Sequence, residues 1–258
     1  MVQKKKIWAG VVEQKQLAPG IFDLWLETDL ALEAKAGQFV GLYPADKSTL
    51  LPRPISICEA DKEKGRLRLV YRVAGQGTRE FSHLKPGEQI GLLGILGNGF
   101  PVEEGKGKRA FLIGGGIGIP PMLQLAKELK ATSQILLGYR DSRLFLQEDL
   151  SLYGEVFVAT EDGSVGTKGN VLDTIIEKGL EGEIIYACGP MPMLRALKAY
   201  GAKKGIPTYL SLEERMACGV GACLGCVCKT VRADHHSHVN NARICTDGPV
   251  FNAEDLDI

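Results

Sequence analysis

Four cysteines near the carboxyl end constrain the fold of this chain more than any other feature of its sequence. Cys218, Cys223 and Cys226 have the spacing Cys-x4-Cys-x2-Cys, and Cys245 follows further along. This is the spacing of plant-type [2Fe-2S] sites, in which four thiolates bind two irons. The loop is rich in glycine, whose backbone freedom allows a short segment to wrap around a cluster. The sequence therefore predicts a [2Fe-2S] cluster bound by these four cysteines, and an electron carrier.

Two other interpretations of the cysteines remain open at this point. Four thiolates can also bind zinc, although such zinc sites usually contain two Cys-x2-Cys pairs and this chain has one. Cys228 could replace Cys226 as a ligand, because alternate residues of the strand that leaves the loop share a face. The total of seven cysteines, with four in one tight group, is more typical of reduced thiols than of a secreted disulfide framework.

The charge balance argues against nucleic acid and membrane partners. The chain has 31 basic and 31 acidic residues, so its formal net charge is zero and it offers no electrostatic attraction for nucleic acid or an anionic membrane. The most hydrophobic window, residues 110–126, is interrupted by three consecutive glycines and two prolines, and the N-terminus lacks the apolar core of a signal peptide. We therefore expect a cytoplasmic protein that does not cross a membrane.

Hydrophobic patterns divide the chain into three expected domains, over residues 1–101, 102–210 and 211–258. In the first, short alternating runs at residues 21–26, 37–42 and 66–73 predict a small antiparallel β-barrel. In the second, apolar strands alternate with helical patterns, which is typical of a parallel α/β sheet. The predicted strands of this sheet are residues 110–113, 134–138, 155–159, 184–188 and 208–212. The third segment is too short for an apolar core, so the cluster is expected to hold it together.

Two turns of the second domain are candidates for binding a dinucleotide. The run Gly114-Gly115-Gly116 follows an apolar strand and opens a helix, a place where phosphate can approach a helix N-terminus. Because a strict Gly-x-Gly-x-x-Gly string is absent, tight strand-to-helix packing is the alternative interpretation. The run Cys188-Gly189-Pro190 ends a later strand of the same sheet, at the edge where α/β sheets place ligands. Two turns on one edge predict one bound nucleotide.

The residues after the second strand of this sheet bear on the choice of nucleotide. Asp141 could accept a hydrogen bond from an adenosine ribose hydroxyl, whereas Arg140 or Arg143 could instead hold a phosphate. The acidic group favours NAD over NADP.

Three segments of the predicted barrel are candidates for binding a flavin. Arg53-Pro54-Ile55-Ser56 is expected to place a cation for the pyrophosphate and a hydroxyl for the ring edge on one face of a strand. Val70-Tyr71-Arg72 offers an aromatic ring and a second cation. Gly77-Thr78 belongs to a turn before a short helix predicted over residues 79–84. Taken alone, the first segment could be an ordinary edge strand with a proline, but together the three favour a flavin site.

The order of these motifs resembles the ferredoxin–NAD(P) reductase superfamily over residues 5–210. The segment 211–228, followed by Cys245-Thr-Asp-Gly-Pro-Val-Phe, looks like the electron-transfer subunits of class B dihydroorotate dehydrogenases, which extends the resemblance to essentially the whole chain. The resemblance implies an FAD-binding barrel, an NAD-binding α/β domain and a [2Fe-2S] lobe. It also implies an FMN-containing catalytic partner subunit, with two copies of each subunit in a heterotetramer.

The resemblance assigns roles to individual residues. It places the cluster on Cys218, Cys223, Cys226 and Cys245. It places catalytic roles on Ser56 and Cys188, with Cys188 near the nicotinamide, although a buried cysteine at a strand end is also common as packing. FAD contacts fall on Arg53, Pro54, Ile55, Ser56, Val70, Tyr71, Arg72, Gly77 and Thr78.

A histidine-rich segment between the third and fourth cysteines departs from the simplest pattern. It contains His235, His236 and His238. Histidine ligands would suggest a Rieske centre, but that site needs Cys-x-His pairs and the chain has none. We therefore expect a solvated loop.

The expected cofactors differ in the number of electrons that they exchange. Nicotinamide exchanges two as hydride, a [2Fe-2S] cluster exchanges one, and flavin can do both, so FAD is expected between the other two. The resemblance implies that electrons pass from the FMN subunit through the cluster and FAD to NAD+. One rival is a differently partnered NAD(P)H:ferredoxin-type reductase. The other is a zinc-stapled binding module on a degenerate reductase scaffold.

Overall fold

The amino-terminal part of the chain forms a closed antiparallel barrel. The computed structural model describes residues 5–46, 48–233 and 239–258, so His235, His236 and His238 lie outside the described residues. The elements of the barrel are β1 (Lys5–Ala18), β2 (Ile21–Glu27), η1 (Asp29–Leu32), β3 (Phe39–Tyr43), β4 (Arg53–Asp61), β5 (Arg66–Arg72), α1 (Gln76–Phe81) and β6 (Gln89–Leu96). Strand order is β1-β2-β5-β4-β3-β6, and β1 pairs with β6 to close the barrel. The predicted antiparallel barrel is confirmed.

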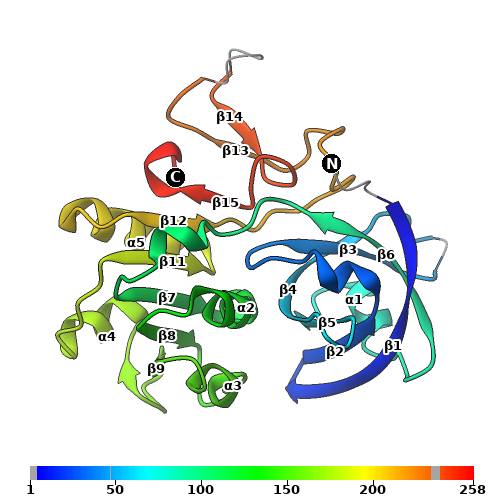
Figure 1. The fold of residues 1–258 in the computed structure, drawn as a ribbon, viewed down its shortest axis with the longest axis horizontal. Coiled ribbons are helices and arrows are strands. Elements are labelled where there is room, and N and C mark those ends of the chain that lie inside the picture. Colours follow the sequence, from blue (N-terminus) through cyan, green and yellow to red (C-terminus); the bar gives the residue numbers. More distant parts are fainter. Residues whose placement is uncertain (1–4, 47, 234–238) are drawn as a thin grey trace.

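The second part is a parallel sheet covered by helices on both faces (Figure 1). Its strands are β7 (Ala110–Gly115), β8 (Ser133–Tyr139), β9 (Glu155–Thr160), β10 (Thr167–Lys168), β11 (Ile184–Cys188) and β12 (Thr208–Ser211). Its helices are η2 (Val102–Gly105), η3 (Gly116–Gly118), α2 (Pro120–Leu129), α3 (Gln147–Ser151), α4 (Val171–Glu177) and α5 (Met191–Lys204). Helices α2 and α3 lie between the sheet and the barrel, and α4 and α5 cover the opposite face. The predicted parallel α/β sheet is confirmed.

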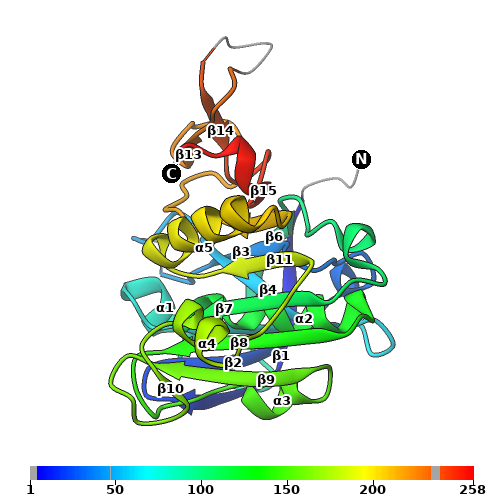
Figure 2. The same ribbon diagram turned by 90° about the vertical axis from the view of Figure 1, so that its left-hand side faces the viewer.

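The carboxyl-terminal lobe sits across one end of both bodies (Figure 2). It contains β13 (Val227–Lys229) and β14 (Asn241–Arg243), which pair with each other, then β15 (Val250–Asn252) and η4 (Ala253–Asp255). Strand β15 pairs antiparallel with β12 and so extends the parallel sheet. Ile244 and Leu256 are buried in the same core as Leu194 and Leu197 of α5. The lobe therefore shares an apolar core with the sheet, which the sequence prediction of a segment held by the cluster alone did not foresee.

Helix α1 begins at Gln76, three residues before its predicted start. The hydroxyl of Thr78 accepts hydrogen bonds from the N–H groups of Ala74 and Gly75, at 2.9 and 3.1 Å, and so caps the helix from within its first turn. Gly77 and Thr78 therefore belong to the helix and not to a preceding loop.

Within the described ranges, no helix is both long enough and apolar enough to span a membrane.

Candidate functional site

A cavity of about 940 Å³ lies between the barrel and the carboxyl edge of the parallel sheet. This edge is where open α/β sheets bind ligands, because strand ends and helix starts leave backbone groups unpaired there. Several residues that the sequence singled out line the cavity, namely Arg72, Gly115, Gly116, Asp141, Gly189 and Pro190. The structure thus brings the two predicted turns of the sheet and one cation of the barrel together around one space.

The glycines of the turn between β7 and α2 have different structural roles. A Cβ at Gly114 would lie 2.7 Å from the Cα of Ile119, so this glycine allows the tight strand-to-helix packing of the alternative interpretation. Gly116 has a φ of +53° and nothing within 4 Å of its missing Cβ, so its backbone faces open space in the cavity wall. Gly118 belongs to the same turn but was not among the predicted binding residues, and it lets the two turns touch, because a Cβ there would lie 2.3 Å from the carbonyl oxygen of Cys188.

Asp141 is held in the cavity wall by Arg143. Its Oδ1 accepts hydrogen bonds from the backbone N–H of Arg143 at 3.0 Å and from Nε at 2.8 Å, and Nη2 of the same guanidinium binds Oδ2. The side-chain hydrogen bond from Arg143 lowers the pKa of Asp141 to about 2. The cavity wall therefore carries a fixed carboxylate, which accepts from hydroxyls and repels phosphate.

Arg53 and Ser56 lie on opposite faces of β4, so the prediction that they share one face is wrong. The two residues are three positions apart, and only alternate residues of a strand share a face. Ile55 and Ile57 are buried inside the barrel, whereas Cys58 is buried in the layer between the barrel and α2. Ser56 has the alternation of Cys58 and therefore points out of the barrel, on the face that carries Cys58.

Arg53 lies instead against the first turn of α1. A Cβ at Gly77 would lie 2.8 Å from the Nε of Arg53, so the absence of a side chain at this position makes room for the guanidinium. Arg53 Nη1 also donates to the carbonyl oxygen of Leu51 at 2.5 Å. The structure thus brings Arg53, Gly77 and Thr78 together, although they come from separate segments.

The three residues Val70, Tyr71 and Arg72 divide between the two faces of β5. Tyr71 is 1% exposed, its ring packs among the barrel core residues, and its hydroxyl donates to Gln14 Oε1 at 3.0 Å. Val70 is buried in the layer facing α2, and Arg72 lines the cavity. The expected aromatic contact is therefore not available from Tyr71, which presents only its backbone outside the barrel.

Cys188 lies behind the cavity wall next to Glu213, a residue that the sequence reasoning missed. Glu213 lines the cavity, and its Oε1 is 3.9 Å from the Sγ of Cys188. Its side chain is open to the cavity, yet desolvation by the surrounding protein raises its pKa, while Arg72 partly offsets that rise. Burial also raises the pKa of the Cys188 thiol. The position of Glu213 just after β12, at the ligand-binding edge, is the sequence signal that could have identified it.

The cysteine loop already aims backbone N–H groups at sulfur. Cys218 Sγ accepts from the N–H groups of Val220 and Ala222, at 3.4 and 3.3 Å, and Cys223 Sγ accepts from Gly225 at 3.4 Å. Desolvation alone would raise the pKa of the Cys218 thiol, but these N–H groups and the Cys223 thiol lower it to about 6. The loop therefore favours the thiolate form, which is the form that binds metal.

The four predicted ligands differ in burial. Cys226 and Cys245 are buried in one core cluster, whereas Cys218 is half-buried and Cys223 is exposed. Together they supply four thiolates, the number that a [2Fe-2S] cluster takes, with two bound to each iron.

Hydrogen bonds join the segment after Cys245 to the end of the barrel. The backbone N–H of Asn98 donates to the carbonyl oxygen of Gly248 at 2.6 Å, and its side-chain amide donates to that of Asp247 at 3.0 Å. Beneath this contact, Leu96 and Phe39 share one buried cluster with Cys226 and Cys245. Phe39 pairs with Ser56 across strands β3 and β4. The cysteine site is therefore packed against the end of the barrel from which Ser56 projects.

Comparison with protein families agrees with this arrangement. Residues 213–257 match the model of the iron–sulfur cluster binding domain of dihydroorotate dehydrogenase B, and this range contains all four predicted ligands. Residues 112–199 match the oxidoreductase NAD-binding domain.

Solved structures show where the fold recurs. One described as an NADH-dependent reduced ferredoxin-NADP oxidoreductase is 28% identical with a TM-score of 0.84, covering 96% of this chain and 89% of that one. A ferredoxin NADP+ reductase from Neisseria gonorrhoeae with bound FAD and NADP is 18% identical with a TM-score of 0.66, covering 83% and 95%. The second likeness shows the fold alone, which is that of the ferredoxin reductases.

Curated relatives cover nearly the whole chain. Dihydroorotate dehydrogenase B (NAD(+)), electron transfer subunit, of Bacillus mycoides is 45% identical over 97% of this chain and 97% of its own length. The protein of the same name from Lysinibacillus sphaericus is 43% identical with the same coverage. The predicted resemblance is confirmed, and the chain belongs to the family of electron transfer subunits of NAD-dependent dihydroorotate dehydrogenase B.

Proposed function

We propose that this chain carries electrons between an FMN-containing dihydroorotate dehydrogenase subunit and NAD+, as part of pyrimidine biosynthesis. The observation that carries the proposal is the packing of the cysteine site against the barrel face of Ser56, with the nucleotide cavity beside the same barrel. Whole-length identity of about 44% to proteins named as such electron transfer subunits supports it. We further propose a cytoplasmic heterotetramer of two chains of each kind, and domain limits of 1–101, 102–210 and 211–258.

The proposed function assigns residues of the chain to a flavin site, a nucleotide cavity and a cluster site. Arg53, beside Gly77 and Thr78, is suited to pair with the pyrophosphate of FAD, because a guanidinium binds two phosphate oxygens at once. Pro54, Ser56 and the backbone of residues 70–72 would border the flavin on the side facing the sheet. Bound FAD can exchange hydride with nicotinamide and single electrons with an iron–sulfur cluster.

The cavity residues would hold and orient the nucleotide. Gly115, Gly116, Gly189 and Pro190 form a wall that a dinucleotide can approach closely. The thiol of Cys188 and the carboxyl of Glu213, 3.9 Å apart, would bound the nicotinamide end. Arg72 faces the same space and offsets the charge of Glu213 when that carboxyl ionises.

The isolated chain is expected to oxidise NADH with an artificial dye but not to oxidise dihydroorotate. The residues proposed to bind FAD and NADH all lie in this chain. No residue of the chain is assigned to binding or oxidising dihydroorotate. The measurement compares both activities before and after addition of the purified catalytic subunit. Dihydroorotate turnover by this polypeptide alone would contradict the proposal.

A second candidate is an NADH:ferredoxin-type reductase with a different partner. It is favoured by the likeness over 96% of the chain to the NADH-dependent reduced ferredoxin-NADP oxidoreductase. The same two-activity comparison separates the candidates, because this alternative predicts reduction of ferredoxin and no gain of dihydroorotate oxidation with the catalytic subunit.

Substituting Glu213→Gln is expected to remove one titration from the pH profile of NADH oxidation. Since desolvation raises the pKa of Glu213 above its ordinary 4.5, the carboxyl keeps its proton over a window in which an exposed glutamate would be ionised. The folded pKa exceeds the unfolded one, so folding stability from this group falls as pH rises through that window. The test measures rate and melting temperature against pH. An inflection that persists unchanged in the glutamine variant would contradict the assignment.

A further inference from the structure

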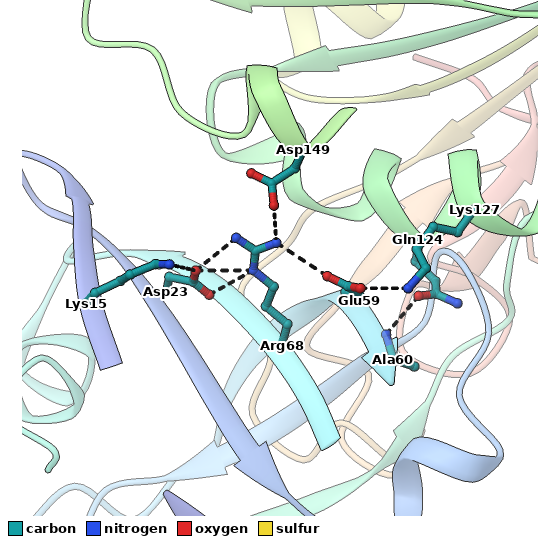
Figure 3. Close-up of polar contacts among 8 residues, drawn as sticks. All are labelled: Lys15, Asp23, Glu59, Ala60, Arg68, Gln124, Lys127 and Asp149. Atoms are coloured by element: carbon teal, nitrogen blue, oxygen red, sulfur yellow. Dashed lines mark hydrogen bonds and ion pairs between the residues drawn. The ribbon is translucent and has the colours of Figure 1, made fainter. Parts of the chain in front are cut away.

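A network of charged side chains crosses the boundary between the barrel and the nucleotide-binding sheet (Figure 3), and none of its residues lines the cavity. At its centre Arg68 of β5 binds Asp23 of β2 through Nε and Nη2, at 3.1 and 3.0 Å. Its Nη1 reaches Asp149 of α3 at 2.6 Å and Glu59 of β4 at 3.4 Å. The side chain of Arg68 is 7% exposed and that of Asp23 is fully buried. One guanidinium therefore joins three carboxylates from both bodies.

Helix α2 makes a second set of contacts with the barrel. Lys127 Nζ binds the other oxygen of Glu59 at 2.6 Å. Gln124 Oε1 accepts a hydrogen bond from the backbone N–H of Ala60 at 2.8 Å, and Glu128 accepts from that of Ala36 at 3.2 Å. We call the residues Asp23, Glu59, Arg68, Lys127 and Asp149 the interdomain latch.

The latch is suited to fixing a geometry more than to adding stability. Desolvation of buried ion pairs consumes much of their Coulomb attraction, so their net contribution to folding is small or unfavourable compared with apolar packing. A guanidinium that binds two oxygens of one carboxylate is, however, directional. Lys15, 3.8 Å from Asp23, balances the charge, so three cations meet three anions. A sliding movement of the two bodies would break the two ion pairs that cross the boundary, Arg68–Asp149 and Lys127–Glu59, while Arg68 would keep Asp23 as its partner within the barrel.

Two strands of the latch carry residues of the cavity wall, and its two helices follow directly on residues or turns that line the cavity. On β5, Arg72 lines the cavity four residues after Arg68 and on the same face, about 13 Å away at the usual rise of a strand. On β2, Ile21 lines the cavity two residues before Asp23. Helix α2 follows directly on the glycine turn, and α3 follows Phe145, which also lines the cavity. A shift of these elements at the latch would therefore also move residues of the cavity wall.

We propose that the interdomain latch positions the nucleotide-binding sheet against the barrel and so sets the separation over which hydride passes between NADH and the flavin. The latch residues touch neither ligand and act as positioning residues. A misplacement of reacting groups by about 1 Å can lower a rate by about 100-fold, so a small rotation at this boundary is enough to matter. This proposal depends on one part of the proposed function, namely that hydride passes between NADH and FAD in this chain.

The test uses the full-length, FAD-loaded chain with Lys127→Met combined with Asp149→Asn. Single-turnover flavin reduction gives both the limiting hydride-transfer rate and the dissociation constant of NADH. We expect the limiting rate to fall tenfold or more while the dissociation constant changes less than threefold. A second readout without NADH is amide hydrogen exchange, in which the N–H groups of Ala36 and Ala60 should exchange faster. Lys106→Met is the matched control, because it removes a 2.6 Å ion pair to Glu103 that does not cross the boundary.

Other outcomes would overturn the proposal. A limiting rate within twofold of wild type, with a lowered melting temperature, would make the latch a stability element only. A weakened NADH affinity at an unchanged limiting rate would assign it to binding. If the double variant does not fold, Asp149→Asn alone is used, since this side chain is 38% exposed. The latch is tested by the ratio of the limiting hydride-transfer rate in the variant to that in the wild type. If NADH does not reduce the flavin of the wild-type chain at all, the proposed function is refuted instead.

Discussion

A Cys245→Ser variant is expected to lose its cluster and to transfer no electrons to or from the catalytic subunit, while still oxidising NADH with a dye. Cys245 is buried in one core cluster with Cys226, and its replacement would remove one of the four predicted thiolate ligands. Serine is a poor substitute because iron–sulfur sites select soft thiolate ligands. The described flavin and nucleotide residues lie elsewhere, so dye reduction should stay within about twofold of wild type. Iron and sulfide content and both activities are measured on the same preparation.

Cys228→Ser is the matched control for this experiment. Cys228 lies in β13, where it pairs with Ala242 of β14, and it is half-buried beside the same loop. If the ligands are Cys218, Cys223, Cys226 and Cys245, the control keeps its iron. Loss of iron in the Cys228 variant together with retention in a Cys226→Ser variant would show that Cys228 replaces Cys226 as a ligand.

Arg53→Ala is expected to purify with much less FAD than the wild-type chain. The substitution removes a charge-assisted contact to phosphate worth about 1.5–3 kcal/mol. This loss corresponds to a dissociation constant for FAD that is about 10- to 150-fold larger. The effect should be local, because Arg53 bonds only to the Leu51 carbonyl among the interactions in the described structure and lies over Gly77. Flavin per chain is measured from the visible spectrum, and affinity by titration of the apoprotein with FAD.

Arg109→Ala controls for the loss of a positive charge. Arg109 pairs with Glu181 and Glu183 in the nucleotide-binding part, away from β4. This variant should retain full flavin. Stoichiometric flavin in the Arg53 variant would remove Arg53 from the pyrophosphate site and leave helix α1 as the remaining anchor to test.

The parts of the fold that could be predicted are those with a strong local signal. The fully apolar run of residues 184–188 was predicted as a strand and is β11 with the same limits, because a strand buried on both faces has no polar interruption. The cysteine spacing predicted the site that the family comparison supports, because the ligands of such a loop lie close together in sequence.

The parts that could not be predicted depend on contacts between distant segments. Strand β15 joins the parallel sheet through pairing with β12, and no local pattern in a three-residue strand encodes its partner. Tyr71 was expected near the flavin, but strand alternation turns its ring into the barrel. Glu213 and the latch around Arg68 were not predicted at all, because their partners lie far away in the sequence.

The most direct test of the central claim is a count of iron and acid-labile sulfide in anaerobically prepared full-length protein, together with electron paramagnetic resonance of the dithionite-reduced sample. The account predicts about two irons and two sulfides per chain and a signal from one reduced [2Fe-2S] cluster. One zinc per chain, or a chain that contains neither iron nor sulfide and gives no signal after reduction, would contradict it.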